Sequence, residues 1–118
     1  MALCPDDFIV LTGDDGTAME SILAGARGNI SVTANVVPAL MHEMCAAALA
    51  KDEARARELD AKLAELSRLL FIESSPIPAK WSLQQMGKIG AGIRLPLVPL
   101  DANFHADVAG ALKKAGAL

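Results

Sequence analysis

The sequence predicts an α/β fold in which two parallel strands, joined by a helix, are followed by a chain that stays helical to its end. Residues 7–12 (DFIVLT) and 29–33 (NISVT) are short apolar runs rich in β-branched side chains, which is typical of strands covered on both faces. Apolar residues between these runs recur at helical spacing, and a strand, a helix and a strand so close together form a right-handed βαβ unit. Two strands are too few for a stable sheet. A complete α/β barrel has eight strands in about 250 residues, and the two strands expected in this chain of 118 residues are about a quarter of them.

The helix of this unit is expected to begin at Asp14 and Asp15 and to end near Gly28, because a glycine commonly closes a helix. The residues expected on its buried face are Met19, Ile22, Leu23 and Ala26.

The two adjacent carboxylates could be a catalytic or metal-binding pair, or they could start the helix. In a first turn an aspartate accepts hydrogen bonds from free backbone N–H groups and meets the positive end of the helix dipole. Adjacent side chains also tend to point apart, so Asp14 and Asp15 would make a poor two-carboxylate clamp, and we expect them to start the helix. Gly13 is more informative, because a residue without a side chain at the carboxyl end of a barrel strand lets a substrate approach the backbone.

Two longer helices are expected next. Pro38 helps to start the first, and Asp52 is the expected N-cap of the second, which would run to about Ile72 with Glu58 and Lys62 as a favourable exposed pair. The apolar face of the first helix would be Val37, Leu40, Met41, Met44, Cys45 and Ala48, and that of the second Ala56, Leu59, Leu63, Leu66 and Leu70.

The rest of the chain predicts two more helices around an extended connector. Ser75 is the expected cap of the first, with Pro76 in its first position and Gly87 as its terminator. The connector, residues 93–100 (IRLPLVPL), cannot be a central strand because its prolines lack the N–H groups that a ladder needs. In the last helix, Phe104, Val108 and Leu112 are expected to face the core. Lys113 and Lys114 are expected near the C-terminal, negative end of the helix dipole.

The composition excludes several kinds of function. Hydrophobic residues make up 53% and charged residues 21% of the chain, which is typical of a globular protein. A net charge of −3 and an aromatic content of 3% argue against a nucleic-acid or anionic-membrane surface, and no apolar run approaches the roughly 20 residues that span a bilayer.

Cys4 and Cys45 have no CxxC partner and no signal peptide ahead of them, which predicts reduced thiols and a cytoplasmic protein. Because so little chain precedes the first strand, we expect a fragment.

Other residues that could carry chemistry have simpler structural explanations. His42 falls on the solvent side of its helix, His105 has no partner in the sequence, and Cys45 falls on an apolar stripe. The glycines match neither a phosphate-binding loop nor a dinucleotide fingerprint. A buried lysine at a barrel strand end can form a Schiff base, but no lysine lies on either predicted strand, and Lys80 is expected to pack its stem against the core beside Trp81. We therefore expect an incomplete catalytic set, with no metal and no cofactor.

Three stretches of the sequence carry a family resemblance. They are residues 10–45 (VLTGDDGTAMESILAGARGNISVTANVVPALMHEMC), 70–87 (LFIESSPIPAKWSLQQMG) and 93–100 (IRLPLVPL). Together they resemble the C-terminal part of the 4-hydroxy-tetrahydrodipicolinate (dihydrodipicolinate) synthase family of lysine biosynthesis, from about Asp7 to the end of the chain. Sister aldolases such as N-acetylneuraminate lyase are a weaker match in SVTANV, PIPAKW and the RLPL stretch. Ser75 departs from the family, which usually has asparagine before Pro-Ile-Pro, and we expect this to alter a cap and not chemistry.

The resemblance implies a (β/α)₈ barrel with a C-terminal helical extension, usually in a homotetramer. Residues 1–50 would then be the last two strand–helix units of the barrel, and 51–118 a three-helix extension. Members of the family condense pyruvate with aspartate semialdehyde, on the diaminopimelate route to lysine, through a Schiff base on a lysine. That lysine lies on the sixth barrel strand, with the catalytic tyrosine and the substrate-binding arginine earlier still. All of these, and the early segments of the lysine-feedback site, would lie upstream of Met1.

Few of the family's site residues have a counterpart in this chain. The resemblance places Gly13 at the end of the seventh barrel strand and Ile30 on the eighth, both in the wall of the pyruvate pocket. Asp14 and Asp15 carry over without a catalytic role.

Whether this chain is an enzyme by itself is left open by the sequence. In one reading it is the C-terminal piece of the synthase, inactive alone, which meets pyruvate and aspartate semialdehyde only in a completed barrel, as a homo-oligomer or with a complementary N-terminal piece. In another it is a truncated, non-catalytic module for assembly or interaction, or a remnant. In a third it is a fragment of a sister pyruvate aldolase such as N-acetylneuraminate lyase.

Overall fold

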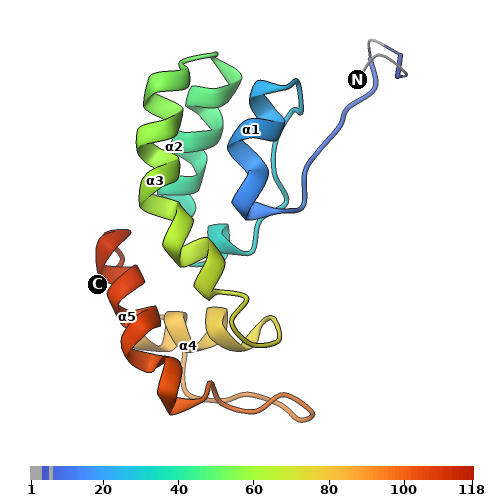
Figure 1. The fold of residues 1–118 in the computed structure, drawn as a ribbon. Coiled ribbons are helices and arrows are strands. Elements are labelled where there is room, and N and C mark those ends of the chain that lie inside the picture. The colour runs from blue at the N-terminus through green and yellow to red at the C-terminus, as the bar shows by residue number, and fades with distance from the viewer. Residues whose placement is uncertain (1–3, 6) are drawn as a thin grey trace.

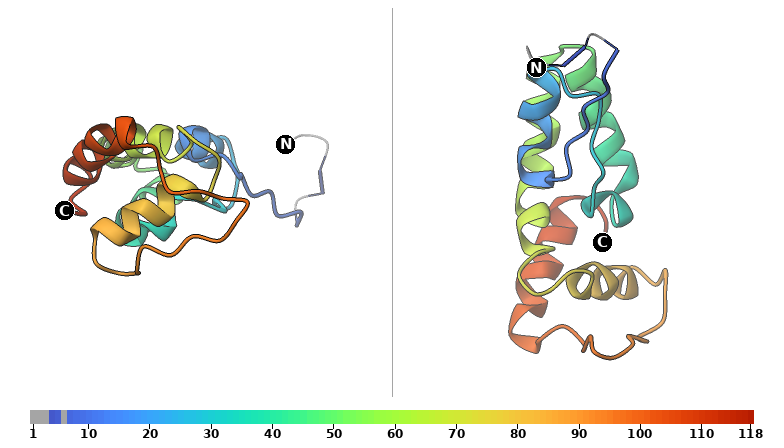
Figure 2. Two further views of the ribbon diagram at one scale, coloured as in Figure 1. Left: turned by 90° about the horizontal axis from the view of Figure 1, so that it is seen from below. Right: turned by 90° about the vertical axis from the view of Figure 1, so that its right-hand side faces the viewer.

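The computed structural model describes residues 4–5 and 7–118, and every regular element of this described part is a helix. The α-helices are α1 (Ala18–Leu23), α2 (Pro38–Leu49), α3 (Glu53–Leu69), α4 (Ile77–Gln85) and α5 (His105–Lys114). The 3-10 helices are η1 (Asp15–Thr17), η2 (Thr33–Asn35) and η3 (Ala102–Phe104). Helices α1, α2 and α3 pack side by side, while α4 and α5 lie at the far end of α3 (Figure 1). The molecule is elongated, with extents of 45 × 30 × 21 Å, and the described residues before η1 reach away from the helices (Figures 1 and 2).

The two predicted strands are present only as a short parallel contact. The hydrogen bonds between them run from Arg27 N to Val10 O (2.8 Å), from Thr12 N to Gly28 O (3.0 Å) and from Ile30 N to Thr12 O (2.8 Å). The parallel direction was predicted correctly. Regular strands at 7–12 and 29–33 are not formed in the described chain, where one isolated bridge joins Thr12 to Asn29 and Thr33 already begins η2, so the two barrel strands stay a prediction. Two extended segments alone leave their outer N–H and C=O groups without ladder partners, and so a regular sheet does not form.

Two of the predicted helix ends are wrong. Helix α1 is closed by Gly25, which has a φ of 117°, and not by Gly28. The carbonyl of Gly28 instead accepts the hydrogen bond from Thr12, because the chain is already extended there. Helix α3 ends at Leu69, earlier than the predicted Ile72, in a last turn tightened by i→i+3 bonds.

The start of α4 also differs from the prediction. Pro76 occupies the N-cap position and Ile77 is the first helical residue, so Ser75 lies outside the helix and does not cap it. The preceding turn is closed by the backbone, because the N–H of Ile77 donates to the carbonyl of Ser74 at 2.9 Å. The terminator was predicted correctly: Gly87 has a φ of 70° directly after the α4 C-cap.

Other local predictions are confirmed. Pro38 is the first residue of α2, and the carboxylate of Asp52 caps α3 by accepting from the N–H of Arg55 at 3.1 Å. Glu58 and Lys62 form an exposed ion pair of 2.9 Å. The connector 93–100 runs without a strand to α5.

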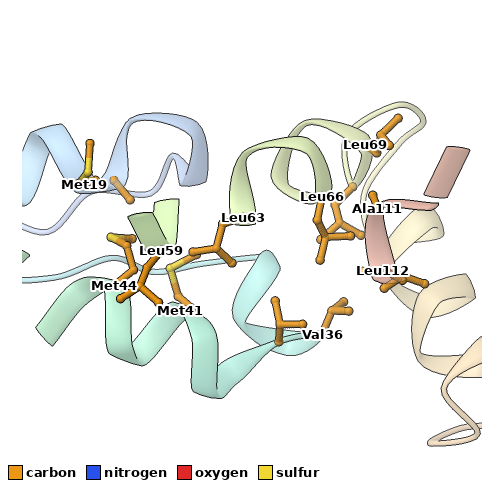
Figure 3. Packing of buried hydrophobic residues seen from close by; sticks show 14 of the residues in the cluster. Met19, Val36, Met41, Met44, Leu59, Leu63, Leu66, Leu69, Ala111 and Leu112 are labelled. Carbon is orange, nitrogen blue, oxygen red and sulfur yellow. The ribbon is translucent and has the colours of Figure 1, made fainter. Parts of the chain in front are cut away.

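The core is organised along α3 and its C-cap Leu70, and the five residues of the predicted stripe are all buried. At one end Leu59 and Leu63 lie toward Met41 and Met44 of α2, and at the other Leu66 and Leu69 lie toward Ala111 and Leu112 of α5 (Figure 3). Val108 and Leu112 of α5 are buried as predicted, and Phe104 is half-buried. One apolar cluster thus crosses residue 50, and a division there into a partial barrel and a helical extension stays a prediction.

No described helix combines the length and the apolar character needed to cross a membrane.

Candidate functional site

The structure brings Gly13 and Ile30, the two predicted site residues, to the same end of the paired segments. The N–H of Ile30 donates to the carbonyl of Thr12, the residue directly before Gly13, at 2.8 Å. The side chain of Ile30 is 71% exposed, and a Cβ added to Gly13 would meet nothing within 4 Å. Both positions therefore face open space, which leaves room for a ligand or for another part of a larger protein.

The same two segments carry large apolar side chains that are exposed to solvent. Each is at least half exposed; they are Phe8, Ile9, Leu11 and Ile30, and we call them the apolar edge. The segment that holds the first three reaches free of the helices (Figure 1). Four exposed large apolar groups on two short paired segments are typical of a surface that another part of a protein covers.

Asp14 and Asp15 have opposite surroundings. The carboxylate of Asp14 is exposed and accepts from the hydroxyl of Thr17 at 2.6 Å, whereas Asp15 is 4% exposed. The expectation that the two side chains point apart is confirmed, and both stand at the start of the helical turn that leads into α1. The expected bonds to free helical N–H groups are wrong for both residues. In the described chain the Asp14 carboxylate makes no capping bond to the backbone, and that of Asp15 reaches across to the end of the second extended segment.

The carboxylate of Asp15 accepts hydrogen bonds at both of its oxygens. One oxygen accepts from the Asn29 side-chain amide at 2.7 Å, and the other from the backbone N–H and the hydroxyl of Thr33 at 2.8 and 2.9 Å. The Thr33 hydroxyl also lies 3.0 Å from the hydroxyl of Ser67 on α3. This buried chain of polar groups, from Asp15 through Thr33 to Ser67, joins η1, η2 and α3.

These bonds decide the charge of Asp15. Burial raises the pKa of the carboxyl, but hydrogen bonds from Ser31, Thr33 and Asn29 outweigh burial and lower the pKa below its usual value. The group is therefore ionised at neutral pH. Its charge acts on Cys45: burial and, after it, the negative charge of Asp15 raise the pKa of that thiol, which keeps it protonated and a poor nucleophile.

The histidines and Lys80 do not gather at the site. His42 is exposed, as predicted. His105 has partners that the sequence did not indicate: its ring stacks on that of Trp81 with 4.6 Å between the ring centroids, and its Nε2 lies 3.1 Å from the carbonyl oxygen of Leu100. Lys80 is half-buried beside Trp81. Among the residues that the structure describes, no three or more His, Cys, Asp or Glu side chains come close enough to hold a metal ion.

Sequence reasoning missed the buried role of Asp15, Thr33 and Ser67. One signal was available: Ser67 follows Leu63 by four residues on α3, so it is a polar residue on the apolar stripe. A buried hydroxyl needs a hydrogen-bond partner, but helical spacing does not say where that partner lies.

The profile of the dihydrodipicolinate synthetase family matches residues 1–115, nearly the whole chain. The chain belongs to this family. The 4-hydroxy-tetrahydrodipicolinate synthase of Azoarcus sp. (strain BH72) is 54% identical over 112 residues, which are 95% of this chain and 38% of the relative. The chain thus spans less than half the length of the curated synthases that it matches.

Solved members of the family contain the same fold. The chloride-inhibited dihydrodipicolinate synthase from Acinetobacter baumannii, solved in complex with pyruvate, is 53% identical and superposes with a TM-score of 0.90 over 94% of this chain and 38% of its own. A monomeric dihydrodipicolinate synthase variant is 39% identical, with a TM-score of 0.90 over 95% of this chain and 37% of its own. The helices and paired segments described above are therefore one part of the dihydrodipicolinate synthase fold.

Proposed function

We propose that this chain is the C-terminal part of a 4-hydroxy-tetrahydrodipicolinate synthase and supplies one wall of its pyruvate pocket. The observation that carries the proposal is the placement of Gly13 and Ile30 at one end of two parallel segments whose apolar edge is uncovered. In this account the parallel segments are the seventh and eighth strands of a (β/α)₈ barrel, and the apolar edge is covered by the strands and helices of the remaining part.

The chemistry of the complete enzyme would be shared between the two parts. The Schiff-base lysine that condenses pyruvate with aspartate semialdehyde would come from the other part of the barrel. Here Gly13 would leave room for the substrate against the backbone and Ile30 would shape the apolar side of the pocket. Because Cys45 is held as a neutral thiol, and Asp15 is buried with its carboxylate engaged by Asn29 and Thr33, neither is suited to be a nucleophile or a base in this part. The 118-residue chain would therefore be inactive alone, and its place would be in a cytoplasmic enzyme of lysine biosynthesis.

A hybrid enzyme tests this function. The part of the Acinetobacter baumannii synthase that matches this chain is replaced by the 118 residues, and the hybrid is assayed with pyruvate and aspartate semialdehyde. We expect synthase activity within about tenfold of the parent enzyme, because the replaced part carries pocket walls and not the reacting groups. A folded hybrid that cleaves N-acetylneuraminate instead would assign the chain to a sister aldolase. A folded hybrid with neither activity would favour a non-catalytic module.

A further inference from the structure

The buried carboxylate of Asp15 is tied to both sides of Ile30. Asn29, directly before Ile30, donates its side-chain amide at 2.7 Å, and Thr33, three residues after it, donates its N–H at 2.8 Å. Ile30 itself is anchored to Thr12 through its own N–H. The backbone of this short stretch is thus held from several directions, while the Ile30 side chain stays free to face outward.

The hydrogen-bond chain has a defined direction. Thr33 has a single hydroxyl proton, and an ionised carboxylate can only accept, so this proton is donated to Asp15 at 2.9 Å. The Thr33 oxygen is then the acceptor, and the hydroxyl of Ser67 donates to it at 3.0 Å. Ser67 therefore connects α3 to the carboxylate through one threonine.

The alternative for Asp15 is a purely local helix start, and the geometry does not favour it. The neighbouring Asp14 is exposed and bonds within its own turn, to Thr17. Asp15 sends its carboxylate away from its own turn to residues of the second extended segment, and a buried charge with several donors orders the groups that donate to it.

We propose that Asp15 is a positioning residue that sets the direction of Ile30 in the pocket wall, and that Ser67 supports it from α3. This inference rests on the proposed function, because only a completed pocket gives Ile30 a substrate to meet. In the complete enzyme, loss of the carboxylate would let the stretch around Ile30 relax and weaken the fit to pyruvate, while the reacting groups in the other part of the barrel would be untouched.

Substitutions in the hybrid enzyme test the proposal. Asp15→Asn should raise the KM for pyruvate about tenfold or more with a much smaller change in kcat, because a displaced wall weakens binding equally in the ground state and the transition state. Ser67→Ala should shift KM in the same direction by a smaller factor. Asp14→Asn is the control for loss of a carboxylate. Ser82→Ala is the control for loss of a buried helical hydroxyl, since the Ser82 hydroxyl donates within its own helix, to the carbonyl of Pro78. Both controls should keep the wild-type KM.

A second measurement does not depend on activity. Amide hydrogen exchange in the 118-residue chain should be faster at Ile30 and Thr33 in Asp15→Asn than in Asp14→Asn. Unchanged exchange at both amides would overturn the proposal, and so would an unchanged pyruvate KM in a folded Asp15→Asn or Ser67→Ala hybrid. If the unsubstituted hybrid is inactive, the proposed function fails, and the exchange data still decide whether Asp15 orders this stretch.

Discussion

Thr33 binds the carboxylate of Asp15 twice, through its backbone N–H at 2.8 Å and through its hydroxyl at 2.9 Å. Eighteen positions separate the two residues, and the bonds fix the place where the second extended segment turns into η2. A buried charge bonded in this way contributes to stability only while it stays ionised.

The first prediction concerns pH. The pKa of Asp15 is lowered in the folded chain, so its contribution is complete above the unfolded pKa of about 3.9 and is lost as the pH falls through the lower folded pKa. Asp15→Asn should therefore lower the free energy of unfolding by about 1.5–3 kcal/mol at pH 7, with a difference from wild type that shrinks in acid. Urea unfolding of the 118-residue chain at pH 7 and at several pH values below about 3.9 measures this. A difference independent of pH would contradict it.

Asp60 should behave in the opposite way. Burial, and then the negative charge of Glu20, raise the pKa of Asp60, although Arg57 partly compensates. Its ionisation costs stability as the pH rises through the unfolded pKa of an ordinary aspartate, so Asp60→Asn should stabilise the chain at pH 7 and have no such effect in strong acid. Loss of stability at pH 7 in the same urea experiment would count against this assignment.

Substitution of Ile30 distinguishes a role in the pocket wall from a role in the hydrophobic core. Because its side chain is exposed, Ile30→Ala should change the free energy of unfolding of the 118-residue chain by no more than about 0.5 kcal/mol. Ile22→Ala, at a buried position of α1, is the comparison and should cost about 2–5 kcal/mol. In the hybrid enzyme Ile30→Ala should raise the KM for pyruvate. An unchanged KM would remove Ile30 from the pocket wall.

The apolar edge should make the isolated chain associate. Unpaired strand edges and uncovered apolar side chains favour contacts between copies, so we expect light scattering to show more than a monomer while circular dichroism shows mostly helix. Ile9→Glu should shift the chain toward monomer, whereas Leu95→Glu, at an exposed site on the connector, should not. A wild-type monomer with slow amide exchange in both extended segments would show that the edge is covered within the chain.

Local patterns predicted the helical part well. The stripe of α3 is buried as its spacing indicates, and Asp52, Pro38 and Gly87 act where capping rules place them, because these signals depend on near neighbours in the chain. The limits of α1 and α3 were wrong by a few residues. For α1 the reason is the pairing with the first extended segment, because of which the chain is already extended at Gly28.

The strands and the site depend on contacts that local patterns do not contain. A buried-type apolar run becomes a strand only when neighbours complete its ladder, and the described chain provides one short contact. The burial of Asp15 depends on Asn29 and Thr33 across the turn and on Ser67 far along α3. Helical spacing marks Ser67 as a polar residue on an apolar stripe, but its partner Thr33 is identified only by the fold.

The location of the pyruvate adduct tests the central claim most directly. The hybrid enzyme is incubated with pyruvate, reduced with borohydride and digested, and the modified lysine is found by mass spectrometry. We predict an adduct in the part taken from the Acinetobacter baumannii enzyme, and none in the 118 residues, whether in the hybrid or in the chain alone. A borohydride-dependent adduct on Lys80 or any other lysine of this chain, abolished when that lysine is replaced by arginine, would show that the chain carries the nucleophile itself.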